Sequence, residues 1–185
     1  MISVFLGGSR KINRLNKEIR ERLQNIINQQ FLILVGDANG ADKALQRFLK
    51  ERSYNNVFVY CSGNGCRNNL GNWESVKIGD ESKTKNIKFY MMKDAEMANK
   101  AEYGFMLWDG KSAGTINNVL NLLSKQKKTL IYFSPKKKFY TISNIDILTQ
   151  LLKSCNEEDL KKIDTKINFT KKLEELKSVQ YELVT

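Results

Sequence analysis

The sequence has no histidine, one proline and three cysteines among its 185 residues. Without an imidazole, the chain cannot form a Ser-His-Asp triad, a Cys-His pair or a histidine-ligated metal site. Any catalysis must therefore use carboxylates, hydroxyls, amides, backbone groups, or Lys and Arg side chains. We expect neither a bound metal nor a cofactor.

Long apolar stretches are also missing. No segment approaches the roughly 18 consecutive apolar residues that span a bilayer, and residues 1–6 lack the basic region and cleavage site of a signal peptide. The three cysteines, Cys61, Cys66 and Cys155, form no CxxC pair, and one must remain unpaired, which suits a reducing compartment. We therefore expect a cytoplasmic protein without a disulfide and without a membrane partner.

The formal net charge of +11 is unevenly distributed along the chain. Residues 1–30 carry six basic and two acidic side chains, and residues 110–140 carry seven basic and none acidic, whereas the other segments are nearly balanced. Such clusters can attract nucleic acid or a polyanionic ligand. The alternative is a lysine-rich background composition with solvated side chains, because a charge run alone is usually a solvated face.

Short apolar runs alternate with segments of helical periodicity, which is typical of β-α units. The expected strands are 1–6, 31–35, 57–60, 88–92, 104–108 and 129–133. The expected helices are 11–29, 41–51, 94–102 and 115–125, followed by helical pieces near 144–155, 157–163 and 170–178. Residues 61–85 show no periodicity and are expected to form one long loop.

These elements predict an α/β fold. The strands are almost continuously apolar, as strands covered on both faces must be. We expect a Rossmann-like, doubly wound parallel sheet of about five to seven strands with helices on both faces. Residues 1–140 would form the Rossmann-like domain, and residues 141–185 a helical extension packed on it or on a partner subunit.

Three strand-to-helix turns are rich in small and polar residues. In an open parallel sheet such turns meet at the carboxyl ends of the strands, where ligands bind. Glycines let the backbone approach an anion, and the N–H groups of a helix N-terminus point at it. The expected ligand contacts are Gly7, Gly8, Ser9 and Arg10 in the first turn, Gly36, Asp37, Gly40 and Asp42 in the second, and Lys111, Ser112, Gly114 and Thr115 in the third.

The long loop contributes further candidates. Arg67 can pair with a phosphate, Asn68 and Asn69 can donate to a ligand, and Trp73 can stack on a base. Alternatively, the asparagines only form turns and Trp73 anchors the loop on the core. Trp108 follows an apolar strand and is expected to be a core residue.

The three turns together resemble the SLOG superfamily. This group includes the LOG phosphoribohydrolases, DNA-processing proteins of natural transformation, and nucleotide-sensing domains of bacterial conflict systems. Residues 67–69, with Gly71 and Trp73, resemble a poorly characterised bacterial branch, and the similarity covers about residues 1–135. It implies a Rossmann-like fold and a nucleotide-type ligand whose phosphate lies at Gly114 and Thr115.

The resemblance also bears on catalysis. LOG enzymes use the glutamate of a Gly-Gly-x-Gly-Thr-x-x-Glu motif to hydrolyse the base–ribose bond, and Asn118 occupies that position here. An amide cannot act as a general base or stabilise a developing positive charge as a carboxylate does. The candidates for the missing carboxylate are Asp37, Asp42, Glu74 and Asp109.

Three functions remain open at this point. The first is binding of a nucleotide or nucleotide-derived ligand, for sensing or sequestration. The second is an N-glycosidase that acts on a nucleoside monophosphate or a related nucleotide. The third is a nucleic-acid-binding module, for which we expect weak binding. A homodimer is the expected oligomeric state.

Overall fold

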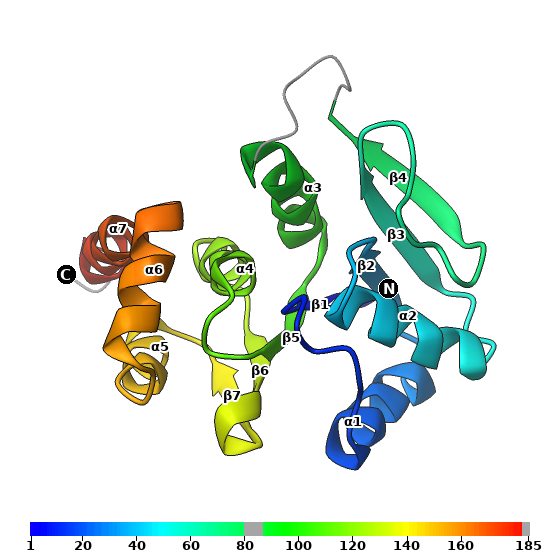
Figure 1. Ribbon diagram of the computed structural model, residues 1–185, viewed down its shortest axis with the longest axis horizontal. Coiled ribbons are helices and arrows are strands. Elements are labelled where there is room, and N and C mark those ends of the chain that lie inside the picture. Colours follow the sequence, from blue (N-terminus) through cyan, green and yellow to red (C-terminus); the bar gives the residue numbers. More distant parts are fainter. Residues whose placement is uncertain (80–86, 183–185) are drawn as a thin grey trace.

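A seven-stranded sheet with the order β4-β3-β2-β1-β5-β6-β7 forms the centre of the protein in a computed structural model, which describes residues 1–79 and 87–182 (Figure 1). The strands are β1 (Ser3–Gly8), β2 (Leu32–Gly36), β3 (Val57–Ser62), β4 (Glu74–Ile78), β5 (Tyr103–Trp108), β6 (Thr129–Phe133) and β7 (Lys138–Ile142). All neighbouring pairs are parallel except β6 and β7, which are antiparallel. The predicted α/β fold of Rossmann-like, doubly wound type is confirmed.

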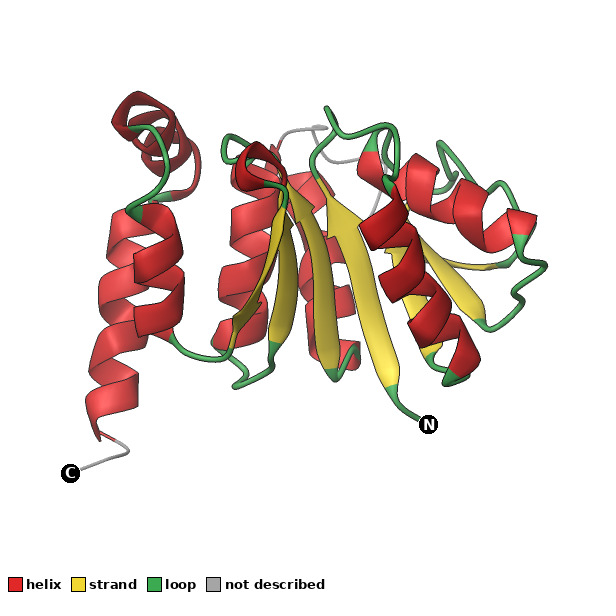
Figure 2. Ribbon diagram, turned by 90° about the horizontal axis from the view of Figure 1, so that it is seen from below, coloured by secondary structure: helices red, strands yellow, loops and turns green. Residues whose placement is uncertain are grey.

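Helices cover both faces of the sheet (Figures 1 and 2). Helices α1 (Lys17–Asn28) and α2 (Ala41–Glu51) pack on one face, and α3 (Ile87–Lys100) and α4 (Ala113–Leu123) pack on the other. The chain ends in α5 (Ile145–Leu152), α6 (Glu157–Ile167) and α7 (Phe169–Glu182), and a 3-10 turn (Ser134–Lys136) precedes β7. Each face has its own cluster of buried apolar side chains, so every central strand is buried on both sides.

Side-chain caps determine where several helices begin. Asn16 accepts a hydrogen bond from the Ile19 N–H, so α1 starts at Lys17 and not at residue 11 as its apolar periodicity predicts. Asn144 and Asn156 cap α5 and α6 in the same way. The apolar residues before α1 still join the core, since Leu15 is buried.

The predicted strand at residues 88–92 is wrong, because this segment is part of α3. A short apolar run cannot be assigned to strand or helix by its composition. Phe89, Lys93, Met97 and Ala101 are buried at intervals of four residues, which is the spacing of one helix face. Asp94, the first residue of the helix predicted for 94–102, therefore lies inside α3.

The long loop predicted for residues 61–85 contains a strand. Glu74–Ile78 forms β4, which pairs with β3 at the edge of the sheet. Its side chains are exposed or half-buried, so it lacks the apolar run that identifies the central strands. A charged, polar edge strand is a common protection against pairing with other chains. Residues 80–85 of the predicted loop lie outside the described residues.

Cys61 and Cys66 form a disulfide, so the prediction that the cysteines stay unpaired is wrong. Cys61 lies near the end of β3, and the turn that follows returns Cys66 to a Cα–Cα distance of 5.0 Å. The two cysteines are five residues apart and do not form a CxxC motif, so the sequence does not predict this pair. The cysteine content is therefore no longer evidence for a reducing compartment. Cys155 is a free thiol, and burial raises its pKa to about 11.

Helices α6 and α7 pack against α4 on the side away from α3, and α5 packs against β7 and α7 (Figure 1). Ile163, Ile167 and Phe169 are buried in the same apolar cluster as the inner face of α4. The Lys172 ammonium group donates to the Asn117 side-chain oxygen at 2.6 Å, which joins α7 to α4. Among residues 1–79 and 87–182, none of the helices has the length and apolar character required to cross a membrane.

Candidate functional site

A cavity of about 700 Å³ opens at the carboxyl ends of β1 and β5. These two strands are adjacent in the sheet, and the chain leaves them in opposite directions, toward β2 and toward β6. Ligands of doubly wound α/β proteins bind in the crevice at such a switch point. The cavity volume falls within the range of about 300–1,000 Å³ found for small-molecule sites.

The β1 and β2 turns are in direct contact beside this cavity. The Ala41 N–H donates to the Ser9 carbonyl at 3.1 Å. Gly40 has a φ of +86°, and a Cβ there would collide with the Arg10 backbone. A glycine at position 40 therefore allows the two turns to approach each other, and this contact helps to place Arg10 at the cavity.

The turn after β5 is organised by Asp109. Its carboxylate accepts the N–H groups of Lys111 at 3.0 Å and Ser112 at 2.8 Å, and the Ser9 hydroxyl at 2.7 Å. The Ser112 hydroxyl in turn caps α4 by accepting the Thr115 N–H. Because these bonds occupy both of its oxygens, Asp109 acts as a turn former that joins the β1 and β5 turns.

Two backbone donors at the start of α4 remain free. In the described part of the chain, no acceptor is bonded to the N–H of Ala113 or Gly114. A Cβ built on Gly114 would meet no atom within 4 Å, so the backbone is open to the cavity at this point. An anion here would also meet the positive end of the α4 dipole.

The other predicted anion-contacting glycines serve the packing of the chain. A Cβ on Gly8 would collide with the Leu107 backbone, and one on Gly36 would collide with the Asp42 carboxylate. Gly7 lines the cavity, but its Cβ would lie 3.3 Å from the Phe5 ring. Of the three glycine-rich turns, the third alone combines a cavity position with open space at its glycine.

Asn118 is buried one turn after Gly114 on α4 and lines the cavity. Only 6% of the residue is exposed, and among the described residues its buried side-chain oxygen has no hydrogen-bond partner. A buried polar atom without a partner is costly and rare. Either orientation of the amide would present hydrogen-bonding capacity to a molecule in the cavity.

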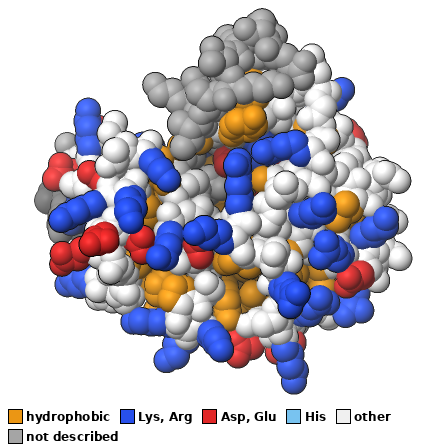
Figure 3. Space-filling view, viewed as in Figure 1, with side chains coloured by type: hydrophobic (Ala, Val, Ile, Leu, Met, Phe, Trp, Pro, Cys, Tyr) orange, Lys and Arg blue, Asp and Glu red, His pale blue; other side chains and the backbone are white. Residues whose placement is uncertain are grey.

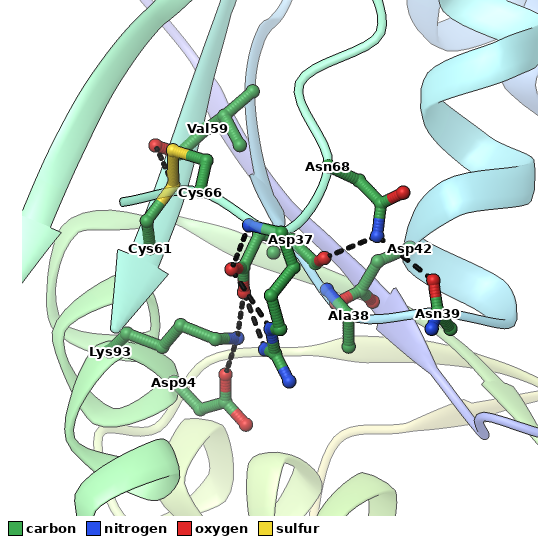
Figure 4. A network of polar contacts seen from close by, with 12 residues as sticks. Asp37, Ala38, Asn39, Asp42, Val59, Cys61, Cys66, Asn68, Lys93 and Asp94 are labelled. Atoms are coloured by element: carbon green, nitrogen blue, oxygen red, sulfur yellow. Dashed lines mark hydrogen bonds and ion pairs between the residues drawn. A yellow bond between two sulfur atoms is a disulfide. The ribbon is translucent and has the colours of Figure 1, made fainter. Parts of the chain in front are cut away.

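Five charged side chains form a network beside the cavity (Figure 4). Arg67 donates to both carboxylate oxygens of Asp37, and the Lys93 ammonium group lies 2.6 Å from Asp94 and 4.0 Å from Asp37. Burial alone would raise the pKa of Asp37, but the Arg67 hydrogen bonds and the Lys93 charge hold it below its usual value. The neighbouring aspartates likewise keep the pKa of Lys93 above its usual value despite its burial.

Asp42 is the fifth member of this network. With three aspartates, one arginine and one lysine, the network carries one excess negative charge when all five side chains are ionised. Burial, together with the charges of Asp94 and Asp37, raises its pKa to about 6, although Lys93 and the Ala38 N–H oppose the shift. The Ala38 N–H donates to one Asp42 carboxylate oxygen at 3.1 Å. Asp42 therefore lines the cavity as a carboxyl group that titrates near neutral pH.

The loop residues that were predicted to contact a ligand act mainly within the protein. Asn68 donates to the Asp37 carbonyl and to Asn39, and Asn69 exchanges hydrogen bonds with the Trp73 backbone. The Trp73 indole is buried and donates to the Tyr54 carbonyl, so the prediction that it stacks on a base is wrong. Arg67 reaches the cavity wall, but its guanidinium is already paired with Asp37.

The four candidate carboxylates have different surroundings. Asp37 is buried beneath Arg67 and does not line the cavity. Glu74 is exposed on the edge strand β4, away from the cavity, so it cannot serve this site. Asp109 is held by its turn. Asp42 is the one of the four that combines a position on the cavity wall with a raised pKa.

Several cavity residues were not predicted from the sequence, because they lie on helices α3 and α6 and not in the glycine-rich turns. Tyr90 of α3 lies against two cations, with the guanidinium carbons of Arg67 and Arg10 at 5.0 and 6.0 Å from its ring centre. Other charged residues of this kind are Lys93 and Asp94 on α3, and Asp159, Lys162 and Lys166 on α6. Lys and Arg side chains stand around a hollow in the space-filling view (Figure 3). Trp108 is fully buried, as predicted.

No model of a known protein family matches this sequence. Comparisons with curated proteins and with solved structures found no match either.

Proposed function

We propose that this protein binds a nucleotide or nucleotide-derived ligand in the cavity between the β1 and β5 turns. The observation that supports this proposal is a combination of features on α4: two N–H groups and the Asn118 side-chain oxygen that have no hydrogen-bond partner among the described residues, and the open backbone at Gly114. An anionic group at Ala113 and Gly114 would accept from the helix N-terminus, and a polar group one turn deeper would meet Asn118.

The rest of the cavity suits the sugar and base of such a ligand. Phe5 and Met97 provide apolar lining, and Tyr90 offers an aromatic side chain. Asp42 and Asp94 are hydrogen-bond acceptors for hydroxyl or amino groups. This separation of an anion-binding end from an acceptor-rich end favours a ligand with one phosphorylated end and one donor-bearing end.

A thermal-shift screen tests the proposal. Ribo-, deoxyribo-, cyclic and dinucleotides would be added to the purified protein, because a ligand at 100 times its dissociation constant adds about 2.7 kcal/mol to the free energy of unfolding. Mass spectrometry of small molecules released from the heat-denatured protein would identify a ligand that co-purifies. Absence of any stabilising nucleotide and of any nucleotide-type molecule in the released fraction would refute the proposal.

The position of Asp42 favours N-glycosidase activity as a second candidate function. A carboxyl group with a pKa of about 6 can donate or accept a proton near neutral pH, as cleavage of a base–ribose bond requires. Chromatography of nucleoside monophosphates incubated with the protein would reveal a released base. Activity that is lost in Asp42→Asn, with retained nucleotide binding, would support hydrolysis, and absence of a released base would leave binding as the function.

The charge distribution favours a small ligand over nucleic acid. Lys111 is at the cavity, but Lys125, Lys127 and Lys128 precede β6 and lie at the amino ends of the strands, opposite the cavity. The basic side chains of residues 110–140 are thus divided between two edges of the sheet. Any oligonucleotide binding should be weak and should decrease steeply with salt, with a log–log slope of about −0.9 per phosphate contacted on duplex DNA.

A further inference from the structure

One wall of the cavity comes from the C-terminal extension. Asp159, Lys162 and Lys166 of α6 all line it, at helix positions i, i+3 and i+7. This spacing places the three side chains on a single stripe of the helix. Helix α6 therefore presents one acidic and two basic groups to the same space as the N-terminus of α4.

The position of α6 is set by contacts with the rest of the domain. Ile163 and Ile167, each next in sequence to a cavity lysine, are buried in the apolar cluster that includes α4. Asp159 pairs with Lys111 of the β5 turn at 3.0 Å. The cavity stripe of α6 is thus held beside the α4 N-terminus before any ligand arrives.

Lys162 and Lys166 differ from Lys111 in their partners. Lys111 is paired with Asp159, whereas the ammonium group of neither α6 lysine makes an ion pair or a hydrogen bond with another described residue. Like charges at positions i and i+4 of a helix repel each other. An anion between the two ammonium groups would relieve this repulsion and form charge-assisted hydrogen bonds.

We propose that Lys162 and Lys166 form a second anion subsite, so that the ligand carries at least two phosphate groups. One phosphate binds the free N–H groups of Ala113 and Gly114, and another binds the α6 lysines across the same cavity. This inference rests on the proposed nucleotide function and adds a substrate class to it: nucleoside diphosphates and other nucleotides with more than one phosphate.

Isothermal titration calorimetry with adenosine and guanosine 5′-mono- and 5′-diphosphates at constant ionic strength tests the subsite. The wild-type protein should bind a diphosphate about tenfold more tightly than its monophosphate, equivalent to about 1.4 kcal/mol. The double variant Lys162→Ala/Lys166→Ala should lose most of this preference and keep its monophosphate affinity within about twofold.

A matched double variant separates local contacts from overall charge. Lys153→Ala/Lys161→Ala also removes two exposed lysines of the extension, but neither residue lines the cavity, so the diphosphate preference should persist. Melting temperatures would verify that all variants fold. If monophosphates bind but the preference is absent, or is equal in all three proteins, the second subsite is refuted while the nucleotide proposal stands. If neither mono- nor diphosphates bind the wild-type protein, the second subsite is refuted, and the thermal-shift screen of the other nucleotide classes decides the nucleotide proposal.

Discussion

Arg67 holds the fully buried carboxylate of Asp37 through three hydrogen bonds, two from its guanidinium and one from its own backbone N–H. The pair connects the loop after β3 to the β2 turn. It thereby fixes the wall of the cavity that Arg67 and Tyr90 share.

Replacement of Arg67 by Met should destabilise the protein by about 2–3 kcal/mol. Loss of the guanidinium leaves the buried Asp37 charge with Lys93 at 4.0 Å and the backbone N–H of residue 67. The usual penalty of about 3–5 kcal/mol is reduced because this N–H remains and because 35% of the Arg67 side chain is exposed. Denaturant unfolding measures the change. The double variant Asp37→Asn/Arg67→Met should recover part of the loss, and simple additivity of the two single changes would contradict direct coupling.

Gly114 should tolerate a side chain without loss of fold. Gly114→Ala has open space and replaces glycine within a helix, so the stability should be unchanged or increase by up to about 1 kcal/mol. Gly114→Val should fill the anion site and weaken nucleotide binding at least about tenfold. Gly65 offers the control, since its Cβ would also meet nothing within 4 Å but lies away from the cavity. Equal nucleotide affinities in Gly114→Val and Gly65→Val would show that the phosphate site is misplaced.

Asn118→Leu should separate stability from binding. The substitution removes an unpaired buried oxygen and keeps a similar volume, so the free energy of unfolding should stay within about 1 kcal/mol or increase. A ligand that bonds to this amide would lose about tenfold in affinity. Thermal unfolding and calorimetry test the two effects, and a large destabilisation without change in affinity would assign Asn118 a purely structural role.

Asp42 should make the stability of the protein depend on pH in an unusual direction. Its pKa is raised by burial from 3.8 to about 6, so the folded state binds the proton more tightly than the unfolded state. The stabilisation is complete below about pH 4 and is lost as the pH rises through about 6. Asp42→Asn should therefore be more stable than the wild type at pH 8, by up to about 3 kcal/mol, and equal to it at pH 4. Stability curves of the two proteins that run parallel from pH 4 to 8 would contradict this assignment.

The sequence by itself determined the central architecture. The continuous apolar runs of β1, β2, β5 and β6 required burial on both faces, and the apolar periodicity of α2 and α4 supplied the covering helices. The same local patterns placed the first and third turns, including Ser9, Arg10 and Gly114, at the edge where the cavity lies.

Only the tertiary structure decided which of these residues face a ligand. Similar glycine-rich turns serve different purposes. The backbone of a neighbouring turn or strand excludes a side chain at Gly8 and Gly40, whereas Gly114 faces open space. Tyr90, Lys93 and Lys162 enter the cavity from helices whose local sequence carries no sign of the neighbours they meet. Burial and charge pairing depend on segments that are far apart in the chain. Contacts of this kind raise the pKa of Asp42 and engage Arg67 with Asp37, and among the described residues they leave the Asn118 side-chain oxygen buried without a partner.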